Sequence, residues 1–93
     1  MSTSRQEVYA AIDGERAYQD WRWGRTASGG QPGDGSRTID EWALYIEVYA
    51  RKLADLAATT GDAESVTEKL NGMRKIAAMA VACMECYGAP QRK

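Results

Sequence analysis

Three side chains suited to holding a nucleotide recur every seven residues near the start of the chain. They are Tyr9, Arg16 and Trp23. On a helix this spacing places them along one face, because seven residues make about two turns. Aromatic rings stack on nucleobases and a guanidinium holds phosphate, so this line is a candidate ligand-binding surface. The alternative is structural: the two aromatic residues pack on other helices, and Arg16 pairs with Asp13 or Asp20.

A second set of phosphate-binding groups lies in the glycine-rich stretch of residues 24–38, which holds five of the nine glycines. Arg25, Thr26, Ser28 and Arg37 stand there on a backbone that can approach a ligand closely. Guanidinium, hydroxyl and backbone N–H groups are the groups that hold phosphate in proteins. The stretch lacks the spacing of a P-loop, and no strand precedes it. The alternative interpretation is a solvated loop without a ligand.

Groups able to catalyse a reaction are sparse. The chain contains no histidine, which excludes Ser–His and Cys–His nucleophilic pairs within one chain. Two pairs of acidic residues, Glu64 with Glu68 and Asp40 with Glu41, fall at expected helix N-termini. The helix dipole favours negative charge there whether or not a ligand binds. We therefore expect binding without catalysis and no cofactor.

Metal binding is not expected either. The all-helical nucleoside-triphosphate pyrophosphohydrolases bind magnesium through acidic residues spaced roughly E-E-x-x-E and E-x-x-D, and that pattern is missing. An enzyme of this class stays as the alternative on general shape. Cys83 and Cys86 form a single C-x-x-C, which cannot complete a four-ligand zinc site alone. We interpret both as small buried hydrophobic residues, reduced in the cytoplasm.

Length and charge restrict the class of partner. Ninety-three residues predict one domain over 1–93, and the formal net charge is −1, from 12 basic and 13 acidic residues. Such balance argues against binding to a long polyanion, which needs clustered positive charge, but it allows a small anionic ligand. No apolar run reaches 18 residues and no signal segment opens the chain, so a cytoplasmic protein that does not bind membranes is expected.

Helix-start signals organise these residues. A Ser or Thr is followed three residues later by Glu at Ser4…Glu7, Thr38…Glu41 and Ser65…Glu68, the pattern of a capping box. Together with a glycine near the C-terminal end of each helix, these three patterns predict helices over 5–23, 39–59 and 66–87. The expected fold class is all-α, a compact three-helix protomer with a short N-terminal helix and a long antiparallel helix pair.

Hydrophobic periodicity indicates self-association. The second helix has one apolar stripe at 3/4 spacing, made of Trp42, Tyr45, Ile46, Tyr49, Leu53 and Leu56. The main stripe of the third helix consists of Val66, Leu70, Met73, Ala77, Ala80, Met84 and Tyr87. The second half of that helix is apolar almost all round, so in a single three-helix chain one side would meet water. We expect a homo-oligomer that covers this side.

Two blocks of sequence resemble a known family. I-D-x-E-R-A-Y-Q-D-x-R-W-G at residues 12–24 and M-R-K-I-A-A-M-A-V-A-C-M-E-x-Y-G at residues 73–88 are similar to small phage proteins, the anti-CBASS sponges. These proteins sequester the cyclic oligonucleotide second messengers of bacterial immunity. The resemblance covers roughly 30 residues, toward both ends of the chain, in clear motif-like form.

The resemblance implies a helical hexamer that holds cyclic dinucleotides between protomers and cyclic trinucleotides in separate pockets, without cleaving them. In the family, a tyrosine of the first helix and a basic residue followed by a threonine line the dinucleotide pocket. Tyr9 and the Arg25–Thr26 pair match these roles best, although Arg replaces the family's Lys and the loop that follows is long. Arg74 is the candidate for the third-helix arginine of the trinucleotide pocket.

The expected function is therefore sequestration of cyclic di- and trinucleotides, such as 3′,3′-cyclic GMP–AMP and cyclic tri-AMP, by a phage-encoded protein in the bacterial cytoplasm. Two alternatives remain open at this point. One is the pyrophosphohydrolase class, and the other is an interaction module whose apolar third helix binds a host partner.

Overall fold

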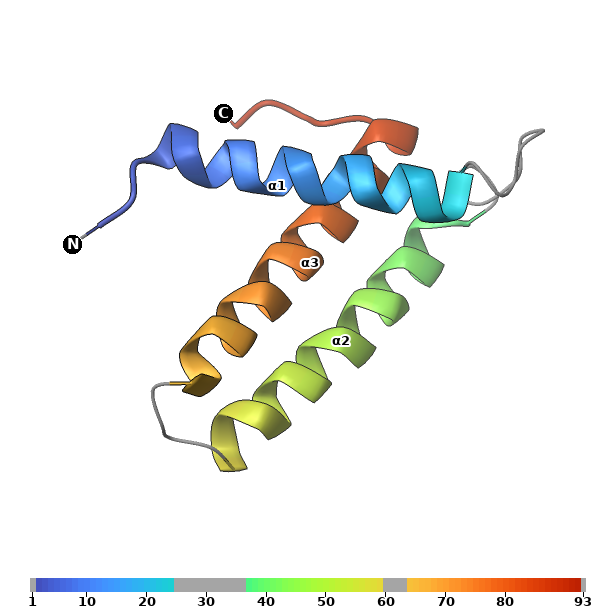
Figure 1. Cartoon of the computed structure of the whole chain (residues 1–93). Coiled ribbons are helices and arrows are strands. Elements are labelled where there is room, and N and C mark those ends of the chain that lie inside the picture. The colour runs from blue at the N-terminus through green and yellow to red at the C-terminus, as the bar shows by residue number, and fades with distance from the viewer. Residues whose placement is uncertain (1, 25–36, 60–63, 93) are drawn as a thin grey trace.

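The computed structural model describes residues 2–24, 37–59 and 64–92, and these ranges contain three α-helices and no strand (Figure 1). Helix α1 spans Arg5–Gln19 and continues as a π-helical segment over Asp20–Gly24. Helix α2 spans Ile39–Thr59, and α3 spans Glu64–Tyr87. The all-α prediction is confirmed, and the predicted bounds of the second helix are those observed.

The first two capping boxes form as predicted. The Ser4 hydroxyl accepts from the Glu7 backbone N–H at 3.1 Å, and the Glu7 carboxylate accepts from the Ser4 N–H at 2.9 Å. These bonds hold the pKa of Glu7 below its ordinary value, since they favour the ionised carboxylate. Thr38 and Glu41 make the same reciprocal pair at 3.0 and 2.8 Å. Each box satisfies two backbone donors that would otherwise lack a helical partner.

The third predicted helix start is wrong. Helix α3 begins at Glu64, so Ser65 lies inside its first turn rather than before it. Ser65 is buried, and it stands seven and fourteen residues before Gly72 and Met79, which face α2. The side of the helix that packs on α2 therefore takes up Ser65, which removes it from the cap position.

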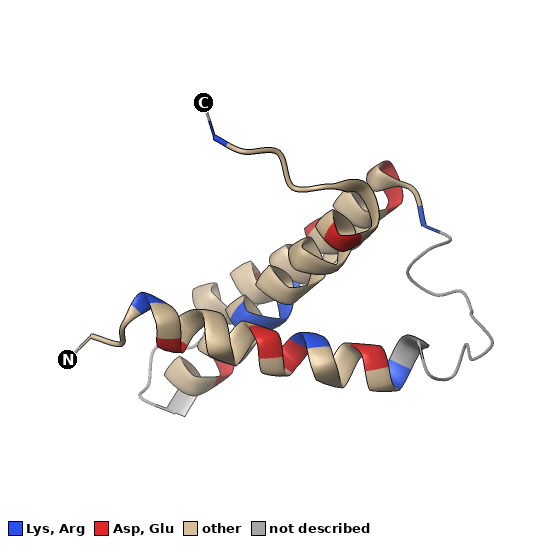
Figure 2. Ribbon diagram, turned by 90° about the horizontal axis from the view of Figure 1, so that it is seen from above, with Lys and Arg blue, Asp and Glu red and all other residues tan. Residues whose placement is uncertain are grey.

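Helices α2 and α3 form an antiparallel pair, and α1 crosses one face of that pair (Figures 1 and 2). The core lies between α2 and α3. Trp42, Met79 and Ala82 are fully buried there, and Ile46 and Tyr49 pack against them together with Cys83. Most of the stripe predicted for the second helix therefore faces α3, with Trp42 as its most buried member, but Tyr45 is 39% exposed.

Gly72 sets how closely α2 and α3 approach each other. A Cβ atom at this position would lie 3.0 Å from Cδ1 of Leu53, which is closer than an ordinary van der Waals contact. A glycine inside a helix costs about 1 kcal/mol relative to alanine, so its use here reflects packing rather than helix propensity.

The apolar stripe of α3 is the side that meets water. Val66, Leu70, Met73, Met84 and Tyr87 are all exposed, between 43% and 62% of their maximum. The buried residues of α3, such as Ala78 and Met79, lie on its other faces. The expectation that a single chain leaves one side of this helix uncovered is confirmed. No helix in the described part of the chain is long and apolar enough to cross a membrane.

Candidate functional site

Of the six residues predicted to form the ligand site, Tyr9, Arg16 and Arg74 have side chains in the described part of the structure. Tyr9 is 62% exposed on the N-terminal part of α1, which extends past α3 in Figure 1. Trp23 belongs to the π-helical segment, but its side chain lies outside the described part of the structure. Arg25 and Thr26, with most of the glycine-rich stretch, also lie outside the described residues.

Arg16 is buried and engaged with other side chains. Its Nη2 and Nε donate to the two carboxylate oxygens of Glu85 at 2.7 and 3.2 Å, and Nη2 also donates to Asp20 at 2.7 Å. Burial alone would lower the pKa of this guanidinium, but the hydrogen bonds and charges of Glu85 and Asp20 more than offset it, so the pKa is raised. The structure thus shows the pairing with Asp20 that was the alternative for Arg16, and adds a link from α1 to α3.

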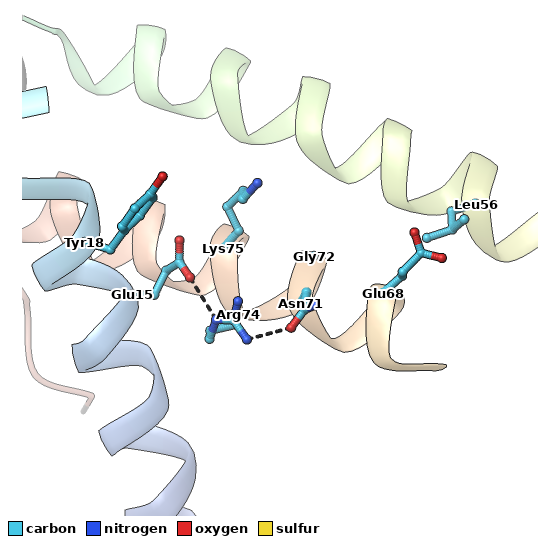
Figure 3. A pocket seen from close by; sticks show the side chains of 8 residues that line it. All are labelled: Glu15, Tyr18, Leu56, Glu68, Asn71, Gly72, Arg74 and Lys75. Atoms are coloured by element: carbon cyan, nitrogen blue, oxygen red, sulfur yellow. Dashed lines mark hydrogen bonds and ion pairs between the residues drawn. The ribbon is translucent and has the colours of Figure 1, made fainter. Parts of the chain in front are cut away.

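A groove lies where α1, α2 and α3 converge, and it contains two cavities of about 570 and 330 Å³. Glu15, Tyr18 and Lys75 line both cavities, which makes them parts of one groove. The larger cavity is completed by Leu56, Glu68, Asn71, Gly72 and Arg74 (Figure 3), and the smaller one by Gln19, Arg22 and Tyr49. Of the predicted site residues that the structure describes, Arg74 is the one that lines this groove.

Charged and polar groups on one wall of the groove form a chain. Arg74 Nε donates to Glu15 at 2.8 Å, and its Nη1 donates to the side-chain oxygen of Asn71 at 2.7 Å (Figure 3). The Glu15 side chain is only 9% exposed. Arg74 is therefore held in place, with part of its charge balanced by a nearly buried carboxylate.

The remaining groups combine aromatic surface with positive charge. In Figure 3 the Tyr18 hydroxyl and the Lys75 ammonium both point toward α2. The Lys75 ammonium lies 5.7 Å from the centroid of the Tyr49 ring, and that of Lys52 lies 5.1 Å from the same ring. Lys75 makes no ion pair with any residue in the described ranges. Its charge is thus available to an anion in the groove.

Gln19 supplies a buried donor beside these groups. It is 2% exposed, its side-chain oxygen accepts from Arg16 at 3.3 Å, and its Nε2 has no hydrogen-bond partner among the described residues. A buried donor left without a partner costs about 1–3 kcal/mol. Because Gln19 lines the smaller cavity, an acceptor on a bound molecule or a water could relieve that cost.

Sequence reasoning did not single out Tyr18, Gln19 or Lys75. All three lie inside the two blocks that carry the family resemblance, Y-Q at positions 18 and 19 and R-K at 74 and 75. The adjacency of an aromatic residue to an amide, and of two cations to each other, was the available signal. Only the fold shows that these residues line one groove.

The cysteine prediction needs a correction. Neither cysteine forms a disulfide, and Cys83 is half-buried, but Cys86 is exposed. Cys86 lies in the last turn of α3, beyond the core around Trp42. Within the described ranges no three acidic or cysteine side chains gather closely enough to hold a metal ion.

Comparisons with protein-family models, with curated proteins and with solved structures found no match to this chain. The groove's own chemistry is therefore the basis for assigning a function. Aromatic faces, ammonium and guanidinium groups and an amide donor are together suited to a small anionic ligand that carries flat rings.

Proposed function

We propose that this protein binds and sequesters cyclic di- and trinucleotide second messengers as a homo-oligomer, without cleaving them, and so inhibits the bacterial immune response that they trigger. The observation that carries the proposal is the lining of the groove. Tyr18 and Tyr49 offer rings, and Lys75 offers an ammonium group within 5.7 Å of one of them.

Stacking and charge supply the affinity. A base stacked on an aromatic side chain gains roughly 1–3 kcal/mol, and a charge-assisted hydrogen bond to phosphate about 1.5–3 kcal/mol. Two bases and two phosphates reach the roughly 12 kcal/mol of a nanomolar complex only if most of these contacts form. A chain with a net charge of −1 can hold such a ligand through local cations without attracting long nucleic acids.

Tyr9 supports a second pocket that needs another copy of the chain. Its ring is exposed on the part of α1 that extends past α3. A pocket around Tyr9 would therefore be closed by a neighbouring protomer, together with Arg25 and Thr26. In this arrangement the pocket at Tyr9 takes cyclic dinucleotides, and the groove at Arg74 takes cyclic trinucleotides.

Native mass spectrometry of the purified chain with 3′,3′-cyclic GMP–AMP and cyclic tri-AMP tests the proposal. The expected result is an oligomer that gains the mass of intact cyclic nucleotides, with no linear product in the supernatant. Recovery of hydrolysed nucleotide, or magnesium-dependent release of pyrophosphate from nucleoside triphosphates, would support the pyrophosphohydrolase alternative. An oligomer that gains no mass would overturn the sponge proposal.

Substitutions locate the ligand. Lys75→Gln should weaken binding of cyclic tri-AMP roughly 10- to 100-fold, the loss of one charge-assisted contact to phosphate. Arg51→Gln is the matched control, because Arg51 also carries one positive charge but pairs with Glu47 on the exposed surface of α2. Isothermal titration should show less than about a twofold change for this control, in line with the small energy of exposed ion pairs.

Tyr9→Ala separates the two pockets. It should abolish binding of 3′,3′-cyclic GMP–AMP while leaving oligomer mass, helicity and cyclic tri-AMP binding unchanged, since the ring is exposed in one chain. An equal loss of binding affinity for both ligands would contradict the assignment of separate pockets. Unfolding of the variant would show that Tyr9 has a structural role instead.

A further inference from the structure

The exposed stripe of α3 has the spacing of a coiled-coil seam. Its seven positions alternate steps of four and three residues: Val66, Leu70, Met73, Ala77, Ala80, Met84 and Tyr87. None of them is charged. Apolar residues that repeat at such positions over three heptads form the seam along which one helix packs on another by knobs-into-holes contacts.

The other two faces of α3 are already occupied within the chain. Gly72 and Met79 face α2, where Leu53 and Trp42 lie. Arg74 and Glu85 contact α1 through ion pairs with Glu15 and Arg16 (Figure 3 shows the former). The seam lies on the third side of α3, where its five large residues are exposed. Ala77 and Ala80 at its centre are half-buried, and the Tyr87 hydroxyl at its end donates to the Arg37 carbonyl.

We propose that a second copy of this chain covers the seam, with the two α3 helices packed antiparallel about a two-fold axis near Ala77 and Ala80. This inference rests on the self-association included in the proposed function, and it supplies the interface. A two-fold pairing uses the same patch on both copies. Each side chain of the seam can therefore pack between residues of the same seam on the partner.

The exposed area is sufficient for a specific interface. With about 200 Å² for a large side chain, the five large residues of the seam leave roughly 500 Å² open on each copy. Two copies would then bury roughly 1,000 Å² from these residues alone, which is the lower bound for a biological interface. An apolar patch of this size is comparable to the largest one on a typical monomer, and such a patch is often functional.

Charges beside the seam favour the antiparallel orientation. Lys69 and Arg74 flank its N-terminal half, whereas Val81 and Cys83 flank its C-terminal half. In a parallel pair Lys69 of one copy would face Arg74 of the other, whose charge Glu15 balances only in part, and like charges across a coiled coil repel. In the antiparallel pair each cation faces the uncharged half of the partner.

Side-chain size agrees with this orientation. The antiparallel register places Ala77 opposite Ala80 at the centre, where two small residues let the helix axes approach closely. It places Met73 opposite Met84 on either side of the centre. Methionine is flexible and fills irregular gaps, which suits positions where two copies of one helix must interdigitate.

Sedimentation equilibrium of the full chain tests the interface. Wild-type protein should sediment as a dimer or a multiple of it at micromolar concentration. Met73→Glu should raise the dissociation constant about 100-fold or more, because it buries an uncompensated charge. Leu44→Glu is the matched control: Leu44 is 62% exposed on α2 against 60% for Met73, and it lies off the seam. Circular dichroism should show unchanged helicity in both variants.

A charge swap tests the orientation. In the antiparallel pair the double variant Met73→Glu with Met84→Lys brings opposite charges together twice, so association should recover relative to Met73→Glu alone. In a parallel pair each introduced charge would face the same charge on the partner helix, so association would fall further. If the double variant associates no better than Met73→Glu alone, the antiparallel assignment is wrong.

Three results would overturn the interface itself: a monomeric wild-type protein, a Met73→Glu variant that associates normally, or equal dissociation by Leu44→Glu. Nucleotide binding is measured separately by titration. A chain that pairs through the seam but binds no cyclic nucleotide would contradict the proposed function and leave the interface intact. A monomeric chain that binds the nucleotides would contradict the interface and leave nucleotide binding intact.

Discussion

Arg16 could serve as a ligand contact or as a link between helices, and its surroundings favour the link. The guanidinium is 4% exposed and donates to Glu85, Asp20 and Gln19. Its pKa is raised, so its contribution to stability is lost only as the pH rises through that value, and the charge persists at any pH at which the protein is studied. A side chain this fully engaged holds α1 on α3.

Arg16→Ala should therefore lower the free energy of unfolding by about 2–3 kcal/mol, through lost charge-assisted hydrogen bonds. Urea unfolding followed by circular dichroism measures this change. Arg51→Ala, which breaks an exposed pair with Glu47, should cost less than about 0.5 kcal/mol. Wild-type stability together with lost nucleotide binding in Arg16→Ala would show that the ligand role is the correct one.

The partner of Arg16 illustrates what the sequence could not show. Spacing on one helix suggested Asp20, and that pair exists. Glu85 is 69 positions away, and no local pattern connects it to Arg16. Side chains that meet across two helices depend on how those helices cross, which periodicity alone does not determine.

Ser4 controls the ionisation of Glu7. Because the folded pKa of Glu7 is lowered by its bonds to Ser4, the capping box stabilises α1 above the unfolded pKa and loses this effect as the pH falls through the folded value. Ser4→Ala should raise the pKa of Glu7 toward its ordinary value, as measured by NMR titration of the Glu7 carboxyl carbon. The Thr38–Glu41 capping box of α2 does not involve Ser4, so the backbone amide resonances of α2 are the internal control and should stay as in wild type. An unchanged Glu7 would contradict the capping bonds.

At the scale of single helices, local signals predicted most of what is observed. The Thr38–Glu41 box and the 3/4 stripe predicted that α2 begins at Ile39 and ends at about Thr59, because both depend only on neighbours within two turns. The start of α3 was wrong because Ser65 is drawn into the contact with α2, a tertiary effect. Neither the capping signals nor the apolar periodicity predicted the π-helical form of Asp20–Gly24.

Two glycines should respond in opposite directions to alanine. Gly14 lies inside α1, and a Cβ there would meet nothing within 4 Å, so Gly14→Ala should stabilise the chain by about 0.5–1 kcal/mol. Gly88 follows α3 with φ +113°, and its N–H donates to the Met84 carbonyl at 2.7 Å. Gly88→Ala should destabilise by about 1 kcal/mol, because L-residues avoid this conformation.

Thermal unfolding measures both effects, and each 1 kcal/mol corresponds to about 4–8 °C in Tm for a chain of this size. The double variant serves as an additivity check, since the two glycines share no contact within 4 Å. A lower Tm for Gly14→Ala would mean that α1 contacts something at Gly14, such as another protomer.

For the whole molecule, the candidate site was predicted only in part. Arg74 was named from the sequence, and it does line the groove. The remaining lining residues come from three helices, so they become a site only once α1 is placed across the α2–α3 pair (Figure 2). Tyr9 stays a prediction, because Arg25 and Thr26, which are expected beside it, lie outside the described residues.

Stability of the assembled protein should depend on its concentration. A chain that buries part of its apolar surface only by pairing is stabilised by mass action, so a 100-fold increase in concentration should raise Tm by several degrees. Differential scanning calorimetry over that range provides the measurement. Met73→Glu should unfold at one temperature at all concentrations, and a concentration-independent wild-type Tm would contradict pairing.

The environment of Trp42 has an optical consequence. Its indole is fully buried, and the Arg37 guanidinium lies 5.1 Å from its ring centroid and 4.6 Å from that of Tyr45. The Arg37 carbonyl in turn accepts a hydrogen bond from the Tyr87 hydroxyl at the end of α3. With Trp21 and Trp23 replaced by phenylalanine, Trp42 would be the sole source of indole fluorescence. Its emission wavelength and quenching would then follow, in real time, any ligand that displaces Arg37 or the end of α3.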